Sequence, residues 1–576
     1  MGHGHHHGHH HHGHDHDHQH GATEQGALPE ALDLNVPDEE LSPSQLSRRG
    51  MLRSAGLLGA GIAGAGLVTG ATGTPAAASQ VGRGGGNNGN NGSRRLRWLA
   101  GDHHIHTQFS PDGMYRVDDQ VRNGSRFGLD WMVITDHGNE NHSRIGVEKV
   151  NPEIRAARET YENALVFQGL EWNIPAAEHG TVFVHPGRDE VSVLKQFERD
   201  YDGGVNNATG NTPTNEALAI SGLDFLAEQV RRRKVRDALM LANHPSRKGV
   251  DSPHEIRAWR DAQPRIAVGF EGAPGHQAAG IPSPHGSGDA RGYYGGSPGA
   301  DSFPGYPAES YRTWGGFDWM TATVGGLWDS LLAEGKPWWI TANSDSHVNY
   351  ADTSRRPDGS DFNGNGFHGD PVYAGAGLNL GAGDFWPGQY SRTHVGAQGF
   401  SYAAVMDGIR AGRIWVDHGG LIAGLDVQLR GGNRSVTLGD TLTVRRGTKV
   451  ELRIEIALAA LPNWANFVPR LARVDVIRGA VTGEVTDRDA FQTPDARVVR
   501  SWEVNETSGT VSFTYDLGRV SEPGYVRLRG TDGKRVQTGL NGAQVDPAGP
   551  ALDVVGDADP WEDLWFYANP IWVIPT

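Results

Sequence analysis

Short apolar runs recur between residues 96 and 344, and each run ends in polar residues. Between them lie longer stretches whose apolar residues recur every three or four positions, as on one face of a helix. Strands that alternate with helices are typical of an α/β protein with a parallel sheet. The apolar runs occupy residues 96–100, 129–135, 164–170, 238–243 and 337–344.

The stretches between and after these runs predict helices. Pro152 and Pro253 would stand in first turns, where a missing backbone N–H breaks no helical hydrogen bond. Gly128 and Gly335 follow predicted helix ends, a position that favours glycine. The predicted helices span residues 117–127, 151–163, 214–233, 252–262, 319–334 and 401–410.

Two long segments, residues 275–316 and 350–390, interrupt this alternation. Both are rich in Gly, Pro, Asp and aromatic residues, and both follow strand ends. Long loops in that position commonly shape a pocket and select its ligand. Their rings would either form an aromatic rim or only pack the loops. These rings belong to Tyr293, Tyr294, Phe303, Tyr306, Phe362, Phe367 and Trp386.

Beyond residue 420 the apolar positions alternate with a period of two. Runs at 427–430, 450–456, 474–478 and 525–529 are separated by Gly-Asp and Pro-Gly turns, and 565–573 forms a closing run. Alternation at short spacing predicts an antiparallel β-sandwich. Such a domain would either support the rest of the chain or bind sugars through its tryptophans.

The amino-terminal residues have a different composition. Residues 1–46 combine a histidine–glycine tract with a polar, acidic stretch, which predicts a disordered tail. The tract is either a native metal-holding tail or a cloning tag.

Residues 47–78 are typical of a twin-arginine signal peptide. Arg48 and Arg49 precede a Gly/Ala-rich run that ends in small residues, so we expect cleavage near Ala78. The run is too short and too rich in glycine for stable membrane insertion. Residues 79–93 are then a flexible linker. The sequence therefore predicts a secreted or extracytoplasmic protein that uses the twin-arginine export machinery.

Net charge and cysteine content exclude several functions. The formal charge of −16, with no compensating basic stripe, argues against nucleic acid as a partner. The absence of cysteine excludes disulfides, thiolate metal sites and a cysteine nucleophile. Any metal site must therefore be built from His, Asp and Glu.

The polar residues that end the apolar runs have the chemistry of metal ligands. His104 and His106 are two residues apart, so on a strand both imidazoles point to the same face. Asp112 follows with a carboxylate, and the other runs end at His137, Glu171, His244, Asp345 and His347. Ligand types at several strand ends predict one metal site.

The same strand ends carry a series of short motifs. The series is H-x-H at 104–106, T-D-H at 135–137, G-L-E at 169–171, N-H-P at 243–245 and S-D-S-H at 344–347. It resembles the motif series of the PHP (polymerase and histidinol phosphatase) family over residues 94–420. Residues 406–416 are similar to the end of the barrel in a secreted branch of that family, named after carbaryl hydrolases. The resemblance implies an α/β fold, a distorted (βα) barrel, with a C-terminal antiparallel β-sandwich domain at 421–576.

The resemblance also implies ligand sets for two or three divalent ions, Zn, Mn or Fe. His104, His106, Glu171 and Asp345 would hold one ion, with Glu171 bridging to a second ion. Asp112, His137 and His347 would hold that second ion. A third would take Glu171, His244 and one more histidine, which is His179 or its rival His185.

These ligands predict a hydrolase without a protein nucleophile. A water that bridges two ions loses a proton near neutral pH and becomes the nucleophile. Asp102 and Asp136 would fix imidazole tautomers. Arg247 would hold a phosphate oxygen. His276, near the Glu271 strand end that faces the site, would protonate the leaving group.

The expected substrate is a small-molecule ester. Relatives imply a phosphate mono- or diester. The secreted branch implies a carboxyl or carbamate ester, whose aryl group an aromatic rim would hold. A non-catalytic metal-binding protein is a third reading, suggested by the amino-terminal histidines.

Overall fold

The computed structural model describes residues 96–373, 377–533 and 559–576. The predicted tail, signal peptide and linker, residues 1–93, lie outside the described residues, so they stay predictions. Within the described part of the chain, no helix combines the length and the hydrophobicity needed to cross a bilayer.

Most strands join one mixed sheet. Backbone pairing runs in the order β19-β18-β21-β22-β13-β12-β1-β2-β3-β4-β5-β6-β9, and β16 pairs with β22. The strands from the amino-terminal part of the chain are β1 (Arg97–Ile105), β2 (Trp131–Ile134), β3 (Leu165–Asn173), β4 (His179–Val184), β5 (Ala238–Ala242), β6 (Ala267–Ala273) and β9 (Trp339–Ala342). The others are β12 (Ser391–Ala397), β13 (Ile414–His418), β16 (Thr441–Val444), β18 (Arg473–Ala480), β19 (Arg497–Glu503), β21 (Gly524–Thr531) and β22 (Trp565–Pro575).

The predicted parallel pairing holds in two blocks. Strands β1, β2 and β3 are parallel, and so are β5, β6 and β9. Strand β4 lies between the blocks and is antiparallel to β3 and to β5, which the sequence pattern did not predict. The reason is the short connection at residues 174–178, because a parallel crossover needs a dozen or more residues.

The predicted barrel is not confirmed, because the described strands form no closed backbone ladder. The pairing path ends at β9, which does not pair with β1. Ile105, the last residue of β1, forms an isolated parallel bridge with Ser346, which follows β9. Thr393 of β12 adds side-chain hydrogen bonds to the backbone of Ala342, at 2.9 and 2.8 Å. The fold is therefore mixed α/β, with β1 and β9 close to each other at the ends that carry polar residues.

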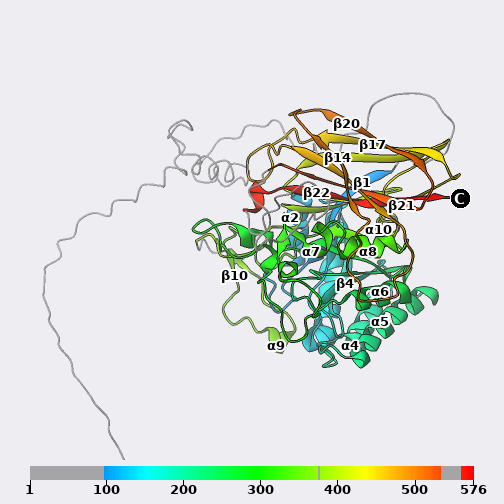
Figure 1. The fold of residues 1–576 in the computed structure, drawn as a ribbon. Helices are drawn as coiled ribbons and strands as arrows, with labels where there is room; N and C mark the ends of the chain where they lie inside the picture. Colours follow the sequence, from blue (N-terminus) through cyan, green and yellow to red (C-terminus); the bar gives the residue numbers. More distant parts are fainter. Residues whose placement is uncertain (1–95, 374–376, 534–558) are drawn as a thin grey trace, which may run out of the picture. The chain divides into compact units, whose positions relative to one another are not determined.

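Helices cover the strands β1 to β6 and β9. They are α2 (Val117–Arg126), α3 (Val147–Thr160), α4 (Glu190–Tyr201), α5 (Pro213–Arg231), α6 (Pro253–Ala262), α7 (Trp319–Ala322), α8 (Leu327–Ala333), α9 (Phe362–Asn365) and α10 (Tyr402–Arg410). Figure 1 shows α4, α5 and α6 next to one another. Helix α4 was not predicted.

Two helix predictions are wrong in detail. The predicted helix 319–334 is two helices, because the chain turns at Gly325, whose φ of +76° favours glycine. Helix α3 begins before residue 151, so Pro152 lies inside it and not in its first turn.

A second sheet has the order β15-β14-β17-β20. Its strands are β14 (Ile422–Gly431), β15 (Arg434–Val436), β17 (Thr448–Leu458) and β20 (Thr510–Val520), and Figure 1 shows β14, β17 and β20 side by side. The predicted period of two is confirmed in β17, where Val450, Leu452, Ile454 and Ile456 are buried.

The two sheets share one apolar core. It combines side chains of β14 and β17 with side chains of β18, β21 and β22, as a β-sandwich requires. The large sheet also continues across residue 420, because β13 pairs with β22. The boundary at residue 420 stays a prediction.

Candidate metal centre

Strand β1 ends with two buried imidazoles. A register shift between Asp102 and Ile105 interrupts the pairing with β2 where His104 stands. The Nδ1 atom of His104 lies 2.7 Å from Oε1 of Glu271, and Nδ1 of His106 lies 2.9 Å from Oγ of Ser110. With Nδ1 occupied in each ring, both histidines present Nε2 to the interior of the site.

These Nε2 atoms meet two carboxylates. His104 Nε2 lies 3.1 Å from Glu171 Oε1 and 3.1 Å from Asp345 Oδ1. His106 Nε2 lies 3.3 Å from Glu171 Oε2 and 3.2 Å from Asp345 Oδ1. Ligand atoms about 2.1 Å from a shared ion are separated by about 3.4 Å in a tetrahedral site and by about 3.0 Å between neighbours in an octahedral one. The four residues therefore have the spacing of one coordination shell.

Buried atoms without partners support this interpretation. Among the described residues, Nε2 of His106, Oδ1 of Asp345 and Nε2 of His347 are buried and accept or donate no hydrogen bond. A buried polar atom without a partner costs about 1–3 kcal/mol. Divalent ions would satisfy these atoms, His106 Nε2 and Asp345 Oδ1 in the first group and His347 Nε2 in a second, so the residues present fit the predicted metals.

Asp112, His137 and His347 form a second group that also includes His106. Asp112 Oδ2 lies 3.2 Å from His137 Nε2, and its Oδ1 lies 3.4 Å from His347 Nε2. Burial favours the neutral acid, but His347 and His137 hold the pKa of Asp112 below its usual range. The carboxylate is therefore ionised, as a metal ligand must be.

The third group forms around the other side of Glu171. Its Oε1 lies 3.0 Å from His179 Nδ1 and 3.2 Å from His244 Nε2. The antiparallel register of β4, which pairs Asn173 with His179, brings this histidine to the site. His185 instead donates from Nδ1 to the Pro186 carbonyl oxygen and packs beside Tyr402.

Glu178 is a site residue that the sequence analysis did not assign. Its Oε2 lies 3.9 Å from both His179 Nε2 and His244 Nδ1, and 3.6 Å from Nη2 of Arg247. Lys248 Nζ lies 2.9 Å from Oε1. Burial opposes ionisation, yet Arg247 and the histidines hold the pKa of Glu178 below its usual range. Its only sequence signal is that it precedes His179.

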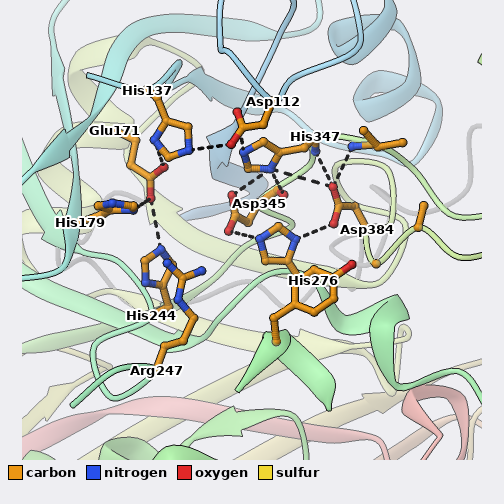
Figure 2. Close-up of a pocket in the computed structure, with 14 residues that line it drawn as sticks. Asp112, His137, Glu171, His179, His244, Arg247, His276, Asp345, His347 and Asp384 are labelled. Atoms are coloured by element: carbon orange, nitrogen blue, oxygen red, sulfur yellow. Dashed lines mark hydrogen bonds and ion pairs between the residues drawn. The ribbon is translucent and has the colours of Figure 1, made fainter. Parts of the chain in front are cut away.

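The three groups open onto a cavity of about 390 Å³ (Figure 2). The residues that line it are mostly charged or polar. They are Asp112, His137, Glu171, His179, His244, Arg247, His276, Tyr293, Asp345, His347, Val348, Ala382, Gly383 and Asp384.

His276 joins two carboxylates in this cavity. Its Nε2 lies 2.8 Å from Asp345 Oδ2, and its Nδ1 lies 2.5 Å from Asp384 Oδ1. Burial opposes the charged form, but Asp345 and Asp384 raise the pKa of His276 to about 10. Asp384 also accepts from the backbone N–H groups of His347, at 2.6 Å, and Val348, at 2.8 Å. Nothing in the glycine-rich sequence around Asp384 indicated this role.

The comparison with known families matches the first part of the site. Residues 102–228 match the PHP domain. The matched segment contains His104, His106, Asp112, His137, Glu171 and His179. His244, Asp345 and His347 follow it in the chain, and the structure brings them to the same cavity.

Two solved structures are also similar to this chain. One is a two-domain protein from Bacteroides vulgatus that contains a predicted PHP-like metal-dependent phosphoesterase. It is 14% identical, with 77% of this chain and 95% of that chain covered, at a TM-score of 0.31. The other is endonuclease Q with a duplex substrate bearing an abasic lesion, 14% identical over 33% of this chain and 46% of that chain, at a TM-score of 0.19. At these TM-scores neither likeness defines the fold. No curated protein matches the chain.

Asp102 and Asp136 do not hold imidazoles in the PHP domain, contrary to the prediction. Asp102 accepts from the backbone N–H groups of His104 and Ser344, each at 2.9 Å. Asp136 accepts from the backbone N–H of Thr107, at 2.6 Å, and from its hydroxyl. The irregular pairing of β1 frees backbone donors, which these short carboxylates satisfy. Burial raises the pKa of Asp102 to about 7.

Glu271 faces the metal centre but does not line the cavity. It is fully buried behind His104, and its Oε2 accepts from the backbone N–H of His244 at 2.9 Å. The sequence predicted that the Glu271 strand end faces the site, and the structure places this carboxylate behind His104 and not at the cavity surface. It positions ligands from two strands.

The seven aromatic residues predicted for a rim do not form one. Tyr293 lines the cavity, but the other rings pack against the loops, where they bury apolar area. Tyr294 donates to Asp318. The remaining contacts are Phe303 with Tyr306 and Phe491, Phe362 with His368, Phe367 with Phe109, and Trp386 with Tyr115.

Proposed function

We propose that this chain is a metal-dependent hydrolase of phosphate mono- or diesters. The observation that carries the proposal is the environment of Glu171. This one buried carboxylate lies within 2.9–3.3 Å of five imidazoles, from His104, His106, His137, His179 and His244. A carboxylate surrounded in this way is suited to bridging ions, and it supports the metal-dependent activity that the PHP match implies.

Two or three divalent ions, Zn, Mn or Fe, fit the three groups. When bound, they would supply an activated water near neutral pH and neutralise charge on phosphoryl oxygens. Imidazole nitrogens and carboxylate oxygens suit each of these metals.

The charge of the cavity supports an anionic substrate. Four of the lining residues are carboxylates, Asp112, Glu171, Asp345 and Asp384, and the lining cations among the described residues are Arg247 and the protonated His276. Two divalent ions balance these carboxylates and Glu178 offsets Arg247, so a third ion leaves the cavity positive. A positive, partly buried site favours a phosphate group over a neutral carbamate.

Two side chains complete the chemistry. Figure 2 shows Arg247 beside His244 and His276 beside Asp384, with Asp345 between the two pairs. Arg247 would hold a phosphoryl oxygen through its guanidinium group. His276 would donate a proton to the leaving oxygen, with Asp384 holding Nδ1 so that Nε2 faces the cavity.

The structure gives less support to the competing hypothesis, in which the substrate is a carbamate ester. A rim of several rings would favour it, and of the seven predicted rings only Tyr293 lines the cavity. The phosphoester reading needs only the polar groups that line the cavity.

Export by the twin-arginine machinery is proposed from residues 47–78 alone, and membership of the secreted, carbaryl-hydrolase-like branch is proposed from residues 406–416. Both rest on sequence motifs.

The test is hydrolysis by metal-loaded protein of p-nitrophenyl phosphate, bis-p-nitrophenyl phosphate and aryl carbamates. We expect the phosphate esters to be hydrolysed and Asp345→Asn to reduce kcat/KM by about two to four orders of magnitude. Glu159→Gln, an exposed substitution on α3, serves as the control. Turnover of carbamates alone, or phosphate ester hydrolysis that excess chelator does not reduce, would contradict the proposal.

A further inference from the structure

Tyr293 is the aromatic residue of the two insertions that lines the cavity. Its side chain is 41% exposed, so its ring is available to a ligand. Its φ is +54°, in the left-handed region that bulky residues rarely adopt. Such a conformation costs of order 1–3 kcal/mol and persists only where the surroundings impose it.

The surroundings of Tyr293 come from both insertions. In the segment 275–316, Gly292 precedes it with a φ of +72°, and its own N–H donates to the Ala290 carbonyl oxygen at 3.0 Å. From the segment 350–390, Gly383 packs against the phenol, since a Cβ at Gly383 would come within 2.2 Å of the hydroxyl oxygen. The position of the ring is therefore determined by two loops.

The ring lies beside His276. The two ring centroids are 4.9 Å apart, with an angle of 48° between the planes. Asp384, which pairs with His276, also accepts from the backbone N–H of Val348, an apolar residue of the lining. Arg247 instead lies near Glu178 and His244. The cavity thus has an anion-binding end and an end with a flat, apolar wall.

We propose that Tyr293 is the wall against which the leaving group lies, and that this site prefers phosphate esters of planar, aromatic alcohols. The inference rests on the proposed function for its position, because the leaving group must be next to His276 when the phosphoryl group is next to Arg247. An aromatic face favours stacked or edge-on rings over a flexible alkyl chain. Contacts between such rings correspond to a preference of about threefold to tenfold.

The experiment compares phenyl phosphate with methyl phosphate on metal-loaded full-length protein. Asparagine tolerates the left-handed region, so Tyr293→Asn removes the ring without new backbone strain. We expect it to lower kcat/KM for phenyl phosphate about threefold to tenfold more than for methyl phosphate. Tyr293→Phe should keep the parental ratio, because the ring and not the hydroxyl supplies the wall. For each substrate, the kcat/KM of the variant is divided by that of the parent protein, so the difference in intrinsic reactivity between the two esters cancels.

Tyr373→Asn is the matched control. Tyr373 is also in an insertion and is 47% exposed, but it does not line the cavity. The Tyr373→Asn substitution should leave the ratio of kcat/KM for phenyl phosphate to that for methyl phosphate unchanged. Equal losses on both substrates with Tyr293→Asn, at parental metal content and melting temperature, would overturn the inference.

Binding of phosphonates that cannot be hydrolysed tests this inference independently of the proposed function. Phenylphosphonate and methylphosphonate carry the same anion without a hydrolysable ester bond. If no phosphate ester is hydrolysed, tighter binding of phenylphosphonate by the parent and its loss in Tyr293→Asn would still support the wall. Equal binding of the two phosphonates by the parent would refute it.

Discussion

His104 and Glu271 form a fully buried pair, in which Nδ1 of the imidazole lies 2.7 Å from Oε1 of the carboxylate. The same carboxylate accepts from the backbone N–H of His244. Glu271 on β6 therefore orients the side chain of His104, on β1, and the backbone of His244, which follows β5. It sets the direction in which His104 Nε2 points, toward Glu171 and Asp345.

Glu271→Gln should weaken the first ligand group. The amide keeps the size of the side chain but removes the charge that holds a proton on Nδ1 of His104. We expect metal content to fall and kcat/KM to drop about 10- to 100-fold. Metal is counted by elemental analysis in protein without residues 1–21, so that any ion held by the histidine tract is not counted. Parental metal content and activity in this variant would show that Glu271 has no positioning role.

His179→Ala and His185→Ala distinguish the two candidates for the third group. His179 contacts Glu171, whereas His185 packs beside Tyr402. We therefore expect His179→Ala to lose about one ion per chain under limiting metal. His185→Ala should retain the parental ion count and activity. The opposite pattern would assign the ligand to His185.

Arg247→Ala should weaken binding of the phosphate group. The guanidinium is the lining cation beside His244, and its loss removes a charge-assisted hydrogen bond to the substrate. We expect KM to rise, and inhibition by inorganic phosphate to weaken, each about tenfold or more. Lys248→Ala is the control, because Lys248 pairs with Glu178 but is 62% exposed and does not line the cavity. An equal effect of both substitutions would indicate a role through Glu178 alone.

The free energy of unfolding should depend on pH through Glu255, a buried residue that is not part of the metal centre. Burial raises the pKa of Glu255 from 4.5 to about 7, while it accepts from the backbone N–H and hydroxyl of Ser252. Between these pH values the folded protein keeps a proton that the unfolded chain releases. The free energy of unfolding therefore falls as pH rises from 4.5 to 7, by up to about 3 kcal/mol.

Glu255→Gln removes this titration and keeps an oxygen acceptor for Ser252. Urea unfolding at pH 5, 6, 7 and 8 should show the variant gaining stability relative to the parent as pH rises. The exposed Glu159→Gln variant should show a constant difference. If Glu255→Gln also differs from the parent by a constant amount, the buried carboxyl does not titrate in this range.

The exported protein should begin close to Ser79. Arg48 and Arg49 precede the small-residue site at Ala76–Ala78, so replacement of both by lysine should block export and leave the unprocessed chain in the cytoplasm. Mass spectrometry of the exported protein determines its first residue. Export of the Lys-Lys variant at the parental level would contradict the twin-arginine route.

Deletion of residues 1–21 tests whether the histidine tract loads the metal. A flexible tail of ligands raises the local ion concentration near the folding chain. We expect lower metal occupancy of the exported protein only in metal-limited medium. Equal occupancy with and without the tract would leave it no loading role.

Local sequence patterns determined much of the candidate site. His104 and His106 are two residues apart on a strand, so their shared face follows from strand geometry alone. Glu171, His244 and Asp345 each follow an apolar run, and strand ends of one sheet converge. The period of two in residues 450–456 likewise predicted β17, because one buried face requires alternation.

Tertiary structure alone decided the contacts between segments distant in sequence. The antiparallel register of β4 placed His179, and not His185, against Glu171, and the packing of two long insertions placed Asp384 and Tyr293 at the cavity. Glu271 became a partner of His104 because β6 carries it behind the cavity wall, 167 residues away in the chain. Periodicity and spacing describe neighbours along the chain, whereas register, loop packing and sheet closure depend on side chains that meet only after folding.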